Sequence, residues 1–513
     1  MTSVVLHKAH KNIGLQPVSE LFRRGRIDAS SSRNFSVTSV VNYFSTSVQR
    51  KLRPMKTGIP AVSPARRIAF DILMAVERGS AHSDDLLREK GVSELQQADR
   101  NLATALVLGV LRWQLLLDSR IRPLLRRPSA KLDAEIQIAL RVGAFQLLFL
   151  DRIPAHAAID ESVELAKRAG RRFASGMVNA VLRGFAREID ARSLAGPAAL
   201  EQDFAAAHPA WMVDRWTRSF GAEAAFAICM HNQQPPRPAL RLIDPRAEQE
   251  LASARVRLEP GQLLKAARIV AEGAVTATKA VRTGRARLQD EGSQLIGEIA
   301  AITGAMGECA ERILDLCAAP GGKTLILAER NPQARIVACE ASATRLATLR
   351  QRLAGCGLGV ECRLADATSF DEEAAFDVVL ADVPCSGTGT LGRNPEIRHR
   401  LREADLARYA ERQRAILRAA LRAIRPGGRV VYSTCSLEPE ENEQVVEAVL
   451  AQHAPARAIQ IGTCLEALES EGILLAGGAE RLRASVTPKG ALRLMPGVFG
   501  TDGFFAAVIE RST

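Results

Sequence analysis

Two cysteines at the ends of two apolar segments are the residues best suited to chemistry in this chain. Cys385 closes a segment that begins Val378-Val379-Leu380-Ala381, and Cys435 closes the segment Val430-Val431-Tyr432-Ser433-Thr434. Continuous runs of β-branched and apolar residues are typical of strands that are buried on both faces, as in parallel sheets. A thiol at the end of each strand predicts nucleophilic or group-transfer chemistry, because the thiolate is a reactive nucleophile.

A third apolar segment, Ile313–Leu316, runs directly into a glycine-rich turn. The turn reads Cys317-Ala318-Ala319-Pro320-Gly321-Gly322-Lys323-Thr324. In open α/β sheets, ligands bind just beyond the carboxyl ends of the strands. The three segments therefore place a cofactor loop and two thiols at one edge of one sheet, which predicts a thiol-dependent group transfer.

The glycine-rich turn matches neither of the common nucleotide loops. A Walker A loop needs glycine five residues before Gly322, where this chain has Cys317, and the dinucleotide pattern G-x-G-x-x-G is also missing there. Binding of ATP or NAD is therefore not expected. A Gly-Gly turn still lets the backbone approach a small ligand closely.

Acidic residues follow the predicted strands in succession. They are Asp315, Glu340, Asp366 and Asp382. A single acid at a strand end is often only a turn residue. Four in succession favour a ligand site, where carboxylates accept hydrogen bonds from ribose hydroxyls and an adenine amino group. Such a site without a phosphate cradle indicates S-adenosylmethionine.

The hydrophobic periodicity divides the chain into an α-helical part and an α/β part. Residues 61–205 carry helical faces at Ala103–Leu117, Ile136–Leu150, Ala158–Ala169 and Ala174–Phe185, and Ser63 with Pro64 begins an earlier helix. Residues 206–285 predict a small α+β connector. Residues 286–513 alternate strands and helices, as in a doubly wound sheet. The predicted strands are Ile313–Leu316, Arg335–Cys339, Glu361–Leu364, Phe376–Ala381, Arg429–Tyr432 and Phe504–Ile509.

Charge is unevenly distributed over the 513 residues. Residues 1–60 contribute +8 of the net charge of +12, so the bulk charge of the rest is weak evidence for a nucleic-acid partner. Residues 1–60 are rich in Ser and basic residues and lack periodicity. This composition predicts a disordered basic extension or an over-extended start, in preference to a mitochondrial-type transit peptide.

The cysteine pattern indicates reduced thiols. All nine cysteines lie from Cys229 onward, their number is odd, and no C-x-x-C pair occurs. This pattern predicts a cytoplasmic protein without a disulfide framework or a zinc site. No run of eighteen apolar residues occurs, so no membrane-spanning helix and no membrane partner are expected.

Five blocks of this chain resemble the RNA cytosine-C5 methyltransferases. They are Gln289–Gln294, Asp315–Thr324, Asp382–Gly389, Tyr432–Ser436 and Asp502–Phe505. The resemblance spans about Ala206 to Glu510, and the preceding helices resemble the NusB-like RNA-binding domain. The combination resembles the bacterial Sun/Fmu-type 16S rRNA methyltransferases. His399 departs from the pattern, because the family usually has an aromatic residue there.

The resemblance implies a fold, a reaction and a set of roles. The fold is a Rossmann-like S-adenosylmethionine-dependent methyltransferase domain preceded by an all-α NusB-like domain. The substrate is a cytosine of small-subunit rRNA, with tRNA, large-subunit rRNA or a non-catalytic assembly role as alternatives. Cys435 attacks the base, and Cys385 assists proton removal and release. Asp382, three residues before Cys385, is placed to act at the ring nitrogen N3. The cofactor contacts come from Cys317, Ala318, Ala319, Pro320, Gly321, Gly322, Lys323, Glu340, Asp366 and Asp382.

Contacts with RNA phosphates are expected from three arginines that follow the Cys385 block. They are Arg393, Arg398 and Arg400. No obligate protein partner is expected, and the protein is predicted to act as a monomer.

Overall fold

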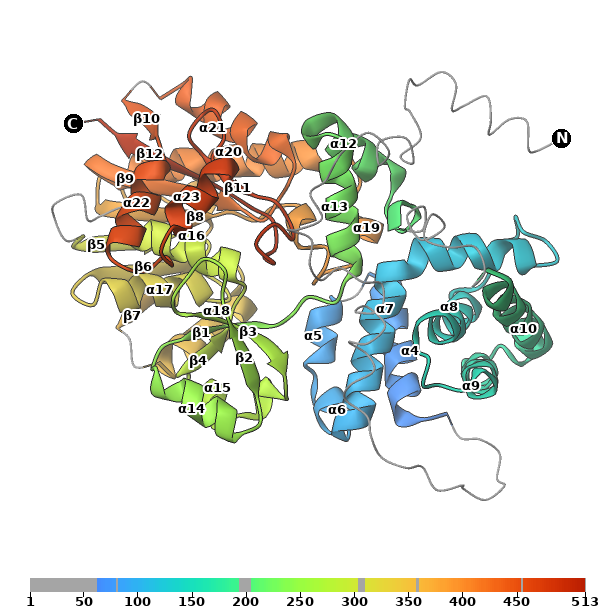
Figure 1. The fold of residues 1–513 in the computed structure, drawn as a ribbon. Helices are drawn as coiled ribbons and strands as arrows, with labels where there is room; N and C mark the ends of the chain where they lie inside the picture. The colour runs from blue at the N-terminus through green and yellow to red at the C-terminus, as the bar shows by residue number, and fades with distance from the viewer. Residues whose placement is uncertain are drawn as a thin grey trace. The chain divides into compact units, whose positions relative to one another are not determined.

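The computed structural model describes residues 62–79, 82–192, 204–302, 310–356, 359–453 and 455–512. The predicted basic extension, residues 1–60, lies outside this part of the chain. The structure divides into two compact units, Met1–Ala207 and His208–Thr513. The described residues of the first are called the helical unit, and those of the second the α/β unit (Figure 1).

The helical unit is a bundle, and no strand occurs among its described residues. Its elements are α4 (Pro64–Glu77), α5 (Ser83–Leu87), α6 (Lys90–Ser93), α7 (Gln97–Ile121), η1 (Arg122–Leu124), α8 (Ala134–Phe149), α9 (Ala155–Arg168), η2 (Arg172–Ala174) and α10 (Ser175–Arg192). The predicted helical faces overlap α7, α8, α9 and α10, and none extends more than one residue beyond its helix, so the all-α prediction is confirmed.

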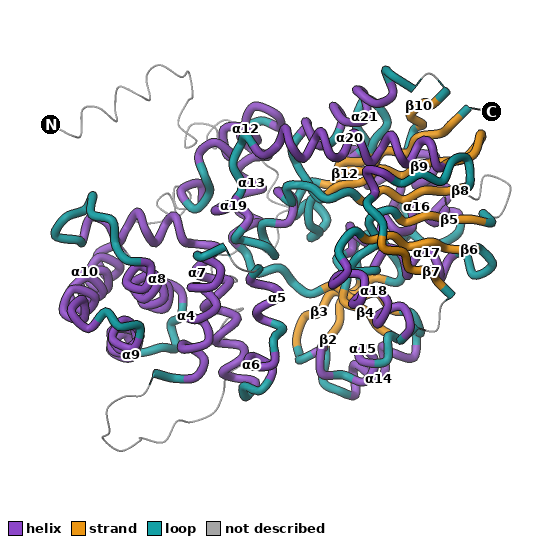
Figure 2. The backbone as a smooth tube through the Cα atoms, turned by 180° about the vertical axis from the view of Figure 1, so that it is seen from behind, coloured by secondary structure: helices purple, strands orange, loops and turns teal. Residues whose placement is uncertain are grey.

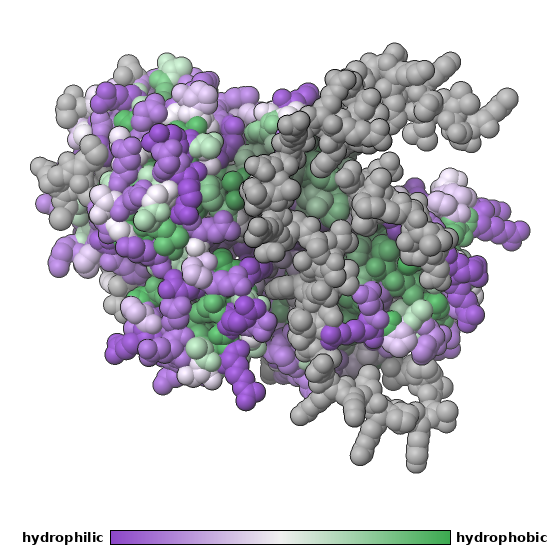
Figure 3. All heavy atoms as spheres, in the orientation of Figure 1, coloured by the Kyte–Doolittle hydropathy of each residue, from purple (hydrophilic) through white to green (hydrophobic). Residues whose placement is uncertain are grey.

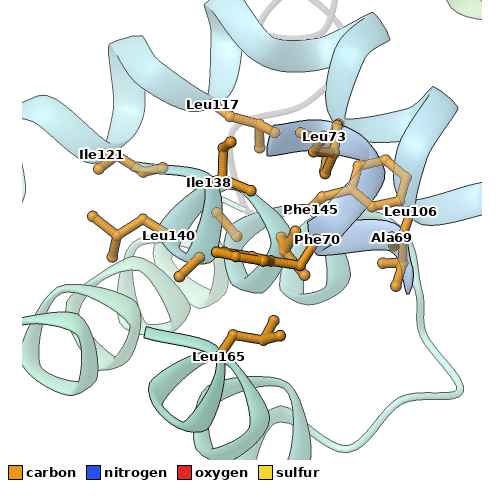
Figure 4. Close-up of a cluster of buried hydrophobic side chains, with 14 of the residues drawn as sticks. Ala69, Phe70, Leu73, Leu106, Leu117, Ile121, Ile138, Leu140, Phe145 and Leu165 are labelled. Carbon is orange, nitrogen blue, oxygen red and sulfur yellow. The ribbon is translucent and has the colours of Figure 1, made fainter. Parts of the chain in front are cut away.

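One apolar core joins the helices of this bundle. Figure 4 shows Phe70 of α4, Leu106 of α7, Phe145 of α8 and Leu165 of α9 pointing into a common interior. All four are nearly fully buried. By length and composition alone α7 could cross a membrane, but its apolar side chains pack within this core.

Helix α4 begins at the predicted position, but the Ser63 side chain does not cap it as the sequence suggests. Ser63 is the N-cap and Pro64 opens the first turn, but the Ser63 side chain makes no cap hydrogen bond. Its hydroxyl donates to Glu161 of α9 at 2.8 Å and accepts from Arg66 at 2.9 Å. Ser63 therefore ties the start of α4 to α9 instead of capping its own helix.

The α/β unit begins with two helices and a small antiparallel sheet. The helices are α12 (Ala210–Phe220) and α13 (Ala222–Gln233). The sheet has the order β2-β3-β1-β4. Its strands are β1 (Ala239–Leu242), β2 (Arg257–Pro260), β3 (Ala267–Glu272) and β4 (Ala286–Leu288), and α14 (Arg246–Ser253), η3 (Val275–Ala277) and α15 (Lys279–Arg282) connect them.

The main sheet has eight strands in the order β10-β12-β9-β8-β5-β6-β7, with β11 paired to β12. The strands are β5 (Arg312–Asp315), β6 (Arg335–Glu340), β7 (Val360–Leu364), β8 (Phe376–Asp382), β9 (Ile424–Thr434), β10 (Ala456–Ile459), β11 (Leu492–Leu494) and β12 (Phe504–Arg511). Strands β5 to β9 are parallel, whereas β12 pairs antiparallel with β9, β10 and β11. The sheet is therefore mixed rather than wholly parallel.

Helices cover both faces of this sheet (Figure 2). On one face, Ile313 and Val378 pack with residues of α16 (Glu291–Ile302), α17 (Gly322–Arg330), α22 (Gly462–Ser470) and α23 (Gly478–Leu482). On the other, Leu314 and Val379 pack with α20 (Asp405–Ala423) and α21 (Glu443–Leu450). Successive strand residues thus enter opposite cores, which explains their continuous apolar runs.

The connections between strands carry the remaining short elements. They are α18 (Ala343–Ala354), η4 (Ala367–Ser369), η5 (Thr388–Thr390), α19 (Ile397–Arg400), η6 (Pro439–Glu441) and η7 (Arg483–Ser485). Hydrophilic side chains cover much of the described α/β surface that faces the viewer in Figure 3. Most apolar residues of the strands are buried, so the polar residues available for chemistry lie at the strand ends.

Candidate active site

The structure brings the two predicted thiols into contact. Strands β8 and β9 are parallel neighbours, with Asp382 opposite Ser433 in the register. Cys385 follows three residues after Asp382, and Cys435 directly follows the end of β9. Their sulfur atoms are 3.4 Å apart, and both residues are partly exposed. Hydrogen bonding to Cys435, together with burial, raises the pKa of the Cys385 thiol well above its ordinary value.

Three other described cysteines, Cys229, Cys317 and Cys339, lie in environments that do not favour reactivity. Burial raises the pKa of both Cys229 and Cys339 to about 12. Burial also raises the pKa of Cys317 well above its ordinary value, although this residue opens the glycine-rich turn. These thiols stay protonated at neutral pH and behave as small apolar residues.

A charged pair lies at the edge of the sheet beside the thiols. The Lys323 amine donates to Oδ2 of Asp382 at 2.6 Å, and the Ser433 hydroxyl donates to Oδ1 at 2.7 Å. Burial opposes the charge of Lys323, but the carboxylate of Asp382 outweighs this effect and raises the pKa of the amine. Cys435 also interacts electrostatically with the amine. Lys323 therefore links the glycine-rich turn to the ends of β8 and β9.

The glycine-rich turn takes its shape from two features. Gly321 has a φ of 95° in the left-handed region, and a Cβ there would lie 2.6 Å from Leu349 Cδ1. Only glycine is compatible with both constraints. The Thr324 hydroxyl donates to Asp315 at 2.7 Å and so joins the first turn of α17 to the end of β5. Burial raises the pKa of Asp315 to about 7.

The other predicted carboxylates occupy successive strand ends. Glu340 is the last residue of β6, and its carboxylate accepts from the backbone N–H of Ser342 at 2.9 Å. Asp366 follows β7 and is exposed, and the backbone N–H and the hydroxyl of Thr368 both donate to its Oδ1 at 2.9 Å. Hydrogen bonds from Thr368 lower the pKa of Asp366. Because β5, β6, β7 and β8 are parallel neighbours, these acids share one edge with the Gly-Gly turn.

A fully buried carboxylate, Glu441 of η6, lies behind the thiols and was not predicted. Its Oε1 accepts from the backbone N–H of Ser386 at 2.8 Å and from the Gln413 amide at 2.9 Å. Its Oε2 accepts from the hydroxyls of Ser386 and Ser436. These serines directly follow the two cysteines, so one carboxylate joins both thiol loops.

Helices α12 and α13 anchor the same loops from another side. Trp216 and Ile228 pack in a cluster with Leu391 and Leu437, which follow Cys385 and Cys435 respectively. The Trp216 indole N–H donates to Glu438 at 3.1 Å. Arg215 pairs with Glu403, Glu438 and Glu440. Residues of the predicted connector thus form part of the wall around the thiol loops.

One of the three arginines predicted to contact phosphate is buried, and another is paired within the fold. The Arg398 side chain is 2% exposed and donates to the Gln233 amide oxygen at 2.8 Å. Arg393 pairs with Asp290 at 2.8 Å and Asp502 at 2.5 Å, so its charge is already neutralised within the fold. The prediction was wrong for Arg398, because a basic stretch in a sequence does not reveal which cations are buried. For Arg393, whose side chain is 30% exposed, it stays a prediction. Arg400 is partly exposed.

The comparisons with known proteins agree with this arrangement. Residues 63–187 match the NusB family, and residues 307–510 match the family described as 16S rRNA methyltransferase RsmB/F. A crystal structure of PH0851 shares the fold with a TM-score of 0.68 and 23% identity, covering 88% of this chain and 100% of that one. The fold and its strand-end site thus define a methyltransferase with an N-terminal NusB domain.

Two curated relatives extend over nearly the whole chain. The chain is 31% identical to the probable ribosomal RNA small subunit methyltransferase B of Bacillus subtilis (strain 168), covering 87% of this chain and 98% of the relative. It is 33% identical to ribosomal RNA small subunit methyltransferase B of Pseudomonas syringae pv. tomato (strain ATCC BAA-871 / DC3000), covering 86% and 96%. The chain belongs to the RsmB/F family of rRNA methyltransferases.

Proposed function

We propose that this protein transfers a methyl group from S-adenosylmethionine to carbon-5 of a cytosine in small-subunit rRNA through a covalent cysteine adduct. The observation that carries the proposal is the contact of two thiols, 3.4 Å apart, at the carboxyl ends of β8 and β9. The Gly-Gly turn and the strand-end acids share this edge. The names of the relatives support rRNA as the substrate class, and a chain that modifies rRNA would work in the cytoplasm.

The chemistry of cytosine explains why thiols are needed. Carbon-5 is too electron-poor to attack a methyl donor unaided. Addition of a thiolate to carbon-6 forms an S–C bond and makes carbon-5 nucleophilic, which divides one difficult step into easier ones. After carbon-5 has taken the methyl group, a base must remove its proton so that the S–C bond breaks and the thiolate leaves. The target base must leave any stack to reach this edge.

Cys435 is the attacking thiol in this proposal, and Cys385 assists release. The raised pKa of Cys385 keeps it protonated, so it can donate its S–H to a Cys435 thiolate. Lys323 interacts electrostatically with Cys435 and so links the attacking sulfur to the glycine-rich turn. Asp382 lies at the end of β8 and is assigned to the ring nitrogen N3, to which its carboxyl group would deliver a proton as negative charge develops there on addition.

The strand-end groups fit S-adenosylmethionine, which supplies an electrophilic methyl group when bound. Cys317–Lys323 would bring the backbone close to the ligand, because the Gly-Gly turn has no side chains to keep it away. Glu340 and Asp366 would accept hydrogen bonds from the ribose hydroxyls and the adenine amino group. Lys323, held by Asp382 at 2.6 Å, would orient the methionine part.

The two cysteine variants give opposite outcomes in an adduct experiment. With Cys435 as nucleophile, Cys385→Ala should accumulate a covalent RNA–protein adduct, because addition and methylation proceed while elimination stalls. Cys435→Ala should form no adduct and should lose methylation by at least about 10³-fold, as expected when a nucleophile is removed. The species are separated on a denaturing gel with labelled small-subunit rRNA and S-adenosylmethionine.

Three results would change the assignment. An adduct with Cys435→Ala but none with Cys385→Ala would exchange the roles of the thiols. Methylation of tRNA or large-subunit rRNA in place of small-subunit rRNA would replace the substrate. RNA binding without any methyl transfer by the unaltered chain would indicate an assembly factor instead of an enzyme.

A further inference from the structure

We propose that Glu441 is a positioning residue of the active site, whose carboxylate holds the Cys385 and Cys435 thiols in contact. The inference rests on the proposed function for its link to methyl transfer. The part of the inference that concerns structure covers only the positions of the two thiols and the protonation of Cys385, and it can be tested without RNA.

Glu441 is placed to act on both thiol loops at once. Its side chain is 0% exposed and lies just after the loop that begins at Cys435. One carboxylate oxygen accepts from the backbone N–H of Ser386, and the other accepts from the hydroxyls of Ser386 and Ser436. The two hydroxyl oxygens are themselves 3.1 Å apart. Because each serine directly follows a cysteine, the hydrogen bonds to this one carboxylate hold both cysteine loops in place.

Neighbouring groups hold Glu441 in place. The Gln413 amide donates to Glu441 and to the backbone carbonyl of Pro384, the residue before Cys385. The Tyr432 hydroxyl donates to the backbone carbonyl of Glu441 at 2.6 Å. Asn442 accepts from the Thr434 hydroxyl and donates to the Ser436 carbonyl. The network therefore spans the residues on either side of both thiols, as a rigid positioning scaffold requires.

The carboxylate also acts on the Cys385 proton. The hydrogen bond with Cys435 and burial raise the pKa of Cys385 most, and electrostatic interactions with Cys435 and Glu441 raise it further. Tyr409 and Tyr432 also interact electrostatically with Cys385, and burial raises the pKa of each, so both are neutral. Glu441 thus adds to the larger effects of Cys435 and burial that favour the protonated Cys385 thiol.

Glu441→Gln tests this role, because it keeps the shape of the side chain and removes the charge. The midpoint of Cys385 alkylation, mapped by peptide mass spectrometry across pH without RNA, should shift to lower pH. The rate of methylation of bound small-subunit rRNA should fall about 10- to 100-fold, as expected for displaced catalytic groups. The KM for S-adenosylmethionine should stay unchanged, because the side-chain bonds of Glu441 go to Ser386, Ser436 and Gln413.

Glu438→Gln is the matched control. Glu438 is a buried carboxylate three residues earlier in the same loop, but its side chain bonds to Arg215, Trp216 and Thr388 rather than to the serines that follow the two cysteines. Removal of the Glu438 charge should lower the free energy of unfolding and leave the pH midpoint of Cys385 alkylation unchanged. If Glu441→Gln fails to fold, Ser386→Ala/Ser436→Ala removes both hydroxyl contacts and retains the charge. This double variant should slow methylation with a smaller shift of the alkylation midpoint.

The outcomes separate the inference from the proposed function. An unchanged alkylation midpoint and an unchanged methylation rate in Glu441→Gln would overturn the inference. The same shift of the midpoint in Glu438→Gln would also overturn it, because general disturbance of the turn would then be the cause. If the unaltered chain methylates no cytosine, the proposed function fails, while the alkylation experiment still decides whether Glu441 controls the thiols.

Discussion

Asp315 shows how burial changes a single residue at the cofactor edge. The side chain is 1% exposed, and its Oδ2 accepts from the Thr324 hydroxyl. Burial penalises the charged carboxylate and raises its pKa to about 7, more than the Thr324 hydrogen bond lowers it. At mildly acidic pH the folded chain therefore holds a proton at Asp315 that the unfolded chain releases. The stability that this proton contributes is present below the ordinary pKa of Asp and is lost as pH rises through about 7.

Asp315→Asn should remove this pH dependence. The variant cannot ionise, so its free energy of unfolding should fall less between pH 5 and pH 8 than that of the unaltered chain. We expect the difference to be on the order of 2–4 kcal/mol, from the size of the pKa shift. Urea unfolding without ligand at the two pH values measures it. Asp366→Asn is the control, because hydrogen bonds from Thr368 lower the pKa of Asp366. Equal pH dependence in Asp315→Asn and the unaltered chain would contradict the argument.

Which site residues were predictable depended on their position relative to the strands. Cys385, Cys435 and Asp382 follow apolar runs, and the parallel order of β8 and β9 brings strand ends together. Glu441 was not predicted, because its partners Ser386 and Ser436 are reached through a loop whose path no periodicity indicates. The only signal in the sequence was the position of Ser436 and Glu441, one and six residues after Cys435.

At the scale of elements, the crossing of α7 and α8 depends on one glycine. A Cβ at Gly109 would lie 2.0 Å from Cζ of Phe145, which is nearly fully buried in the core of the helical unit. The two helices therefore approach closely only because Gly109 has no side chain. Interiors at native packing density leave no room for an added methyl group without displacing neighbours.

Gly109→Ala should destabilise the helical unit by about 1–3 kcal/mol through overpacking. Denaturation followed by the helical circular dichroism signal measures this loss. Gly176→Ala is the matched control, because Gly176 is also helical and a Cβ there would meet nothing within 4 Å. That change should be neutral or stabilise by up to about 1 kcal/mol, as alanine favours helix. Similar losses in the two variants would show that the Phe145 contact is not the cause.

The strands that could be predicted differ from those that could not in how completely both of their faces are buried. Strands β5, β6, β8 and β9 are buried on both faces and so give continuous apolar runs. Strand β10, with an exposed Arg457-Ala458 in the middle of four residues, gives no such signal. The antiparallel direction of β12 also has no local signature, since it depends on how the chain returns through α22, α23 and β11.

At the scale of the whole molecule, the described helical unit has features suited to RNA but no strand-end site. The segment that follows α7 presents exposed cations, which are Arg122, Arg126, Arg127 and Lys131. Lys and Arg side chains that neutralise phosphates supply affinity for nucleic acid without reading its sequence. The thiols, the Gly-Gly turn and the acids all lie in the α/β unit. Binding and chemistry are therefore assigned to different parts of the chain.

This division predicts the behaviour of a shortened chain that begins near Ala206. It retains α12, whose Trp216 and Arg215 both bind Glu438 in the loop after Cys435, and it also retains α13. Its affinity for S-adenosylmethionine, measured by calorimetry, should therefore stay within about threefold of the full chain, a difference of less than 1 kcal/mol. Methylation of the target cytosine in small-subunit rRNA should fall by at least about tenfold, because the exposed cations after α7, which we expect to contact phosphates, are lost. Bisulfite sequencing should also reveal reduced selectivity for that base. Unchanged efficiency at the same base would mean that the helical unit has only a structural role.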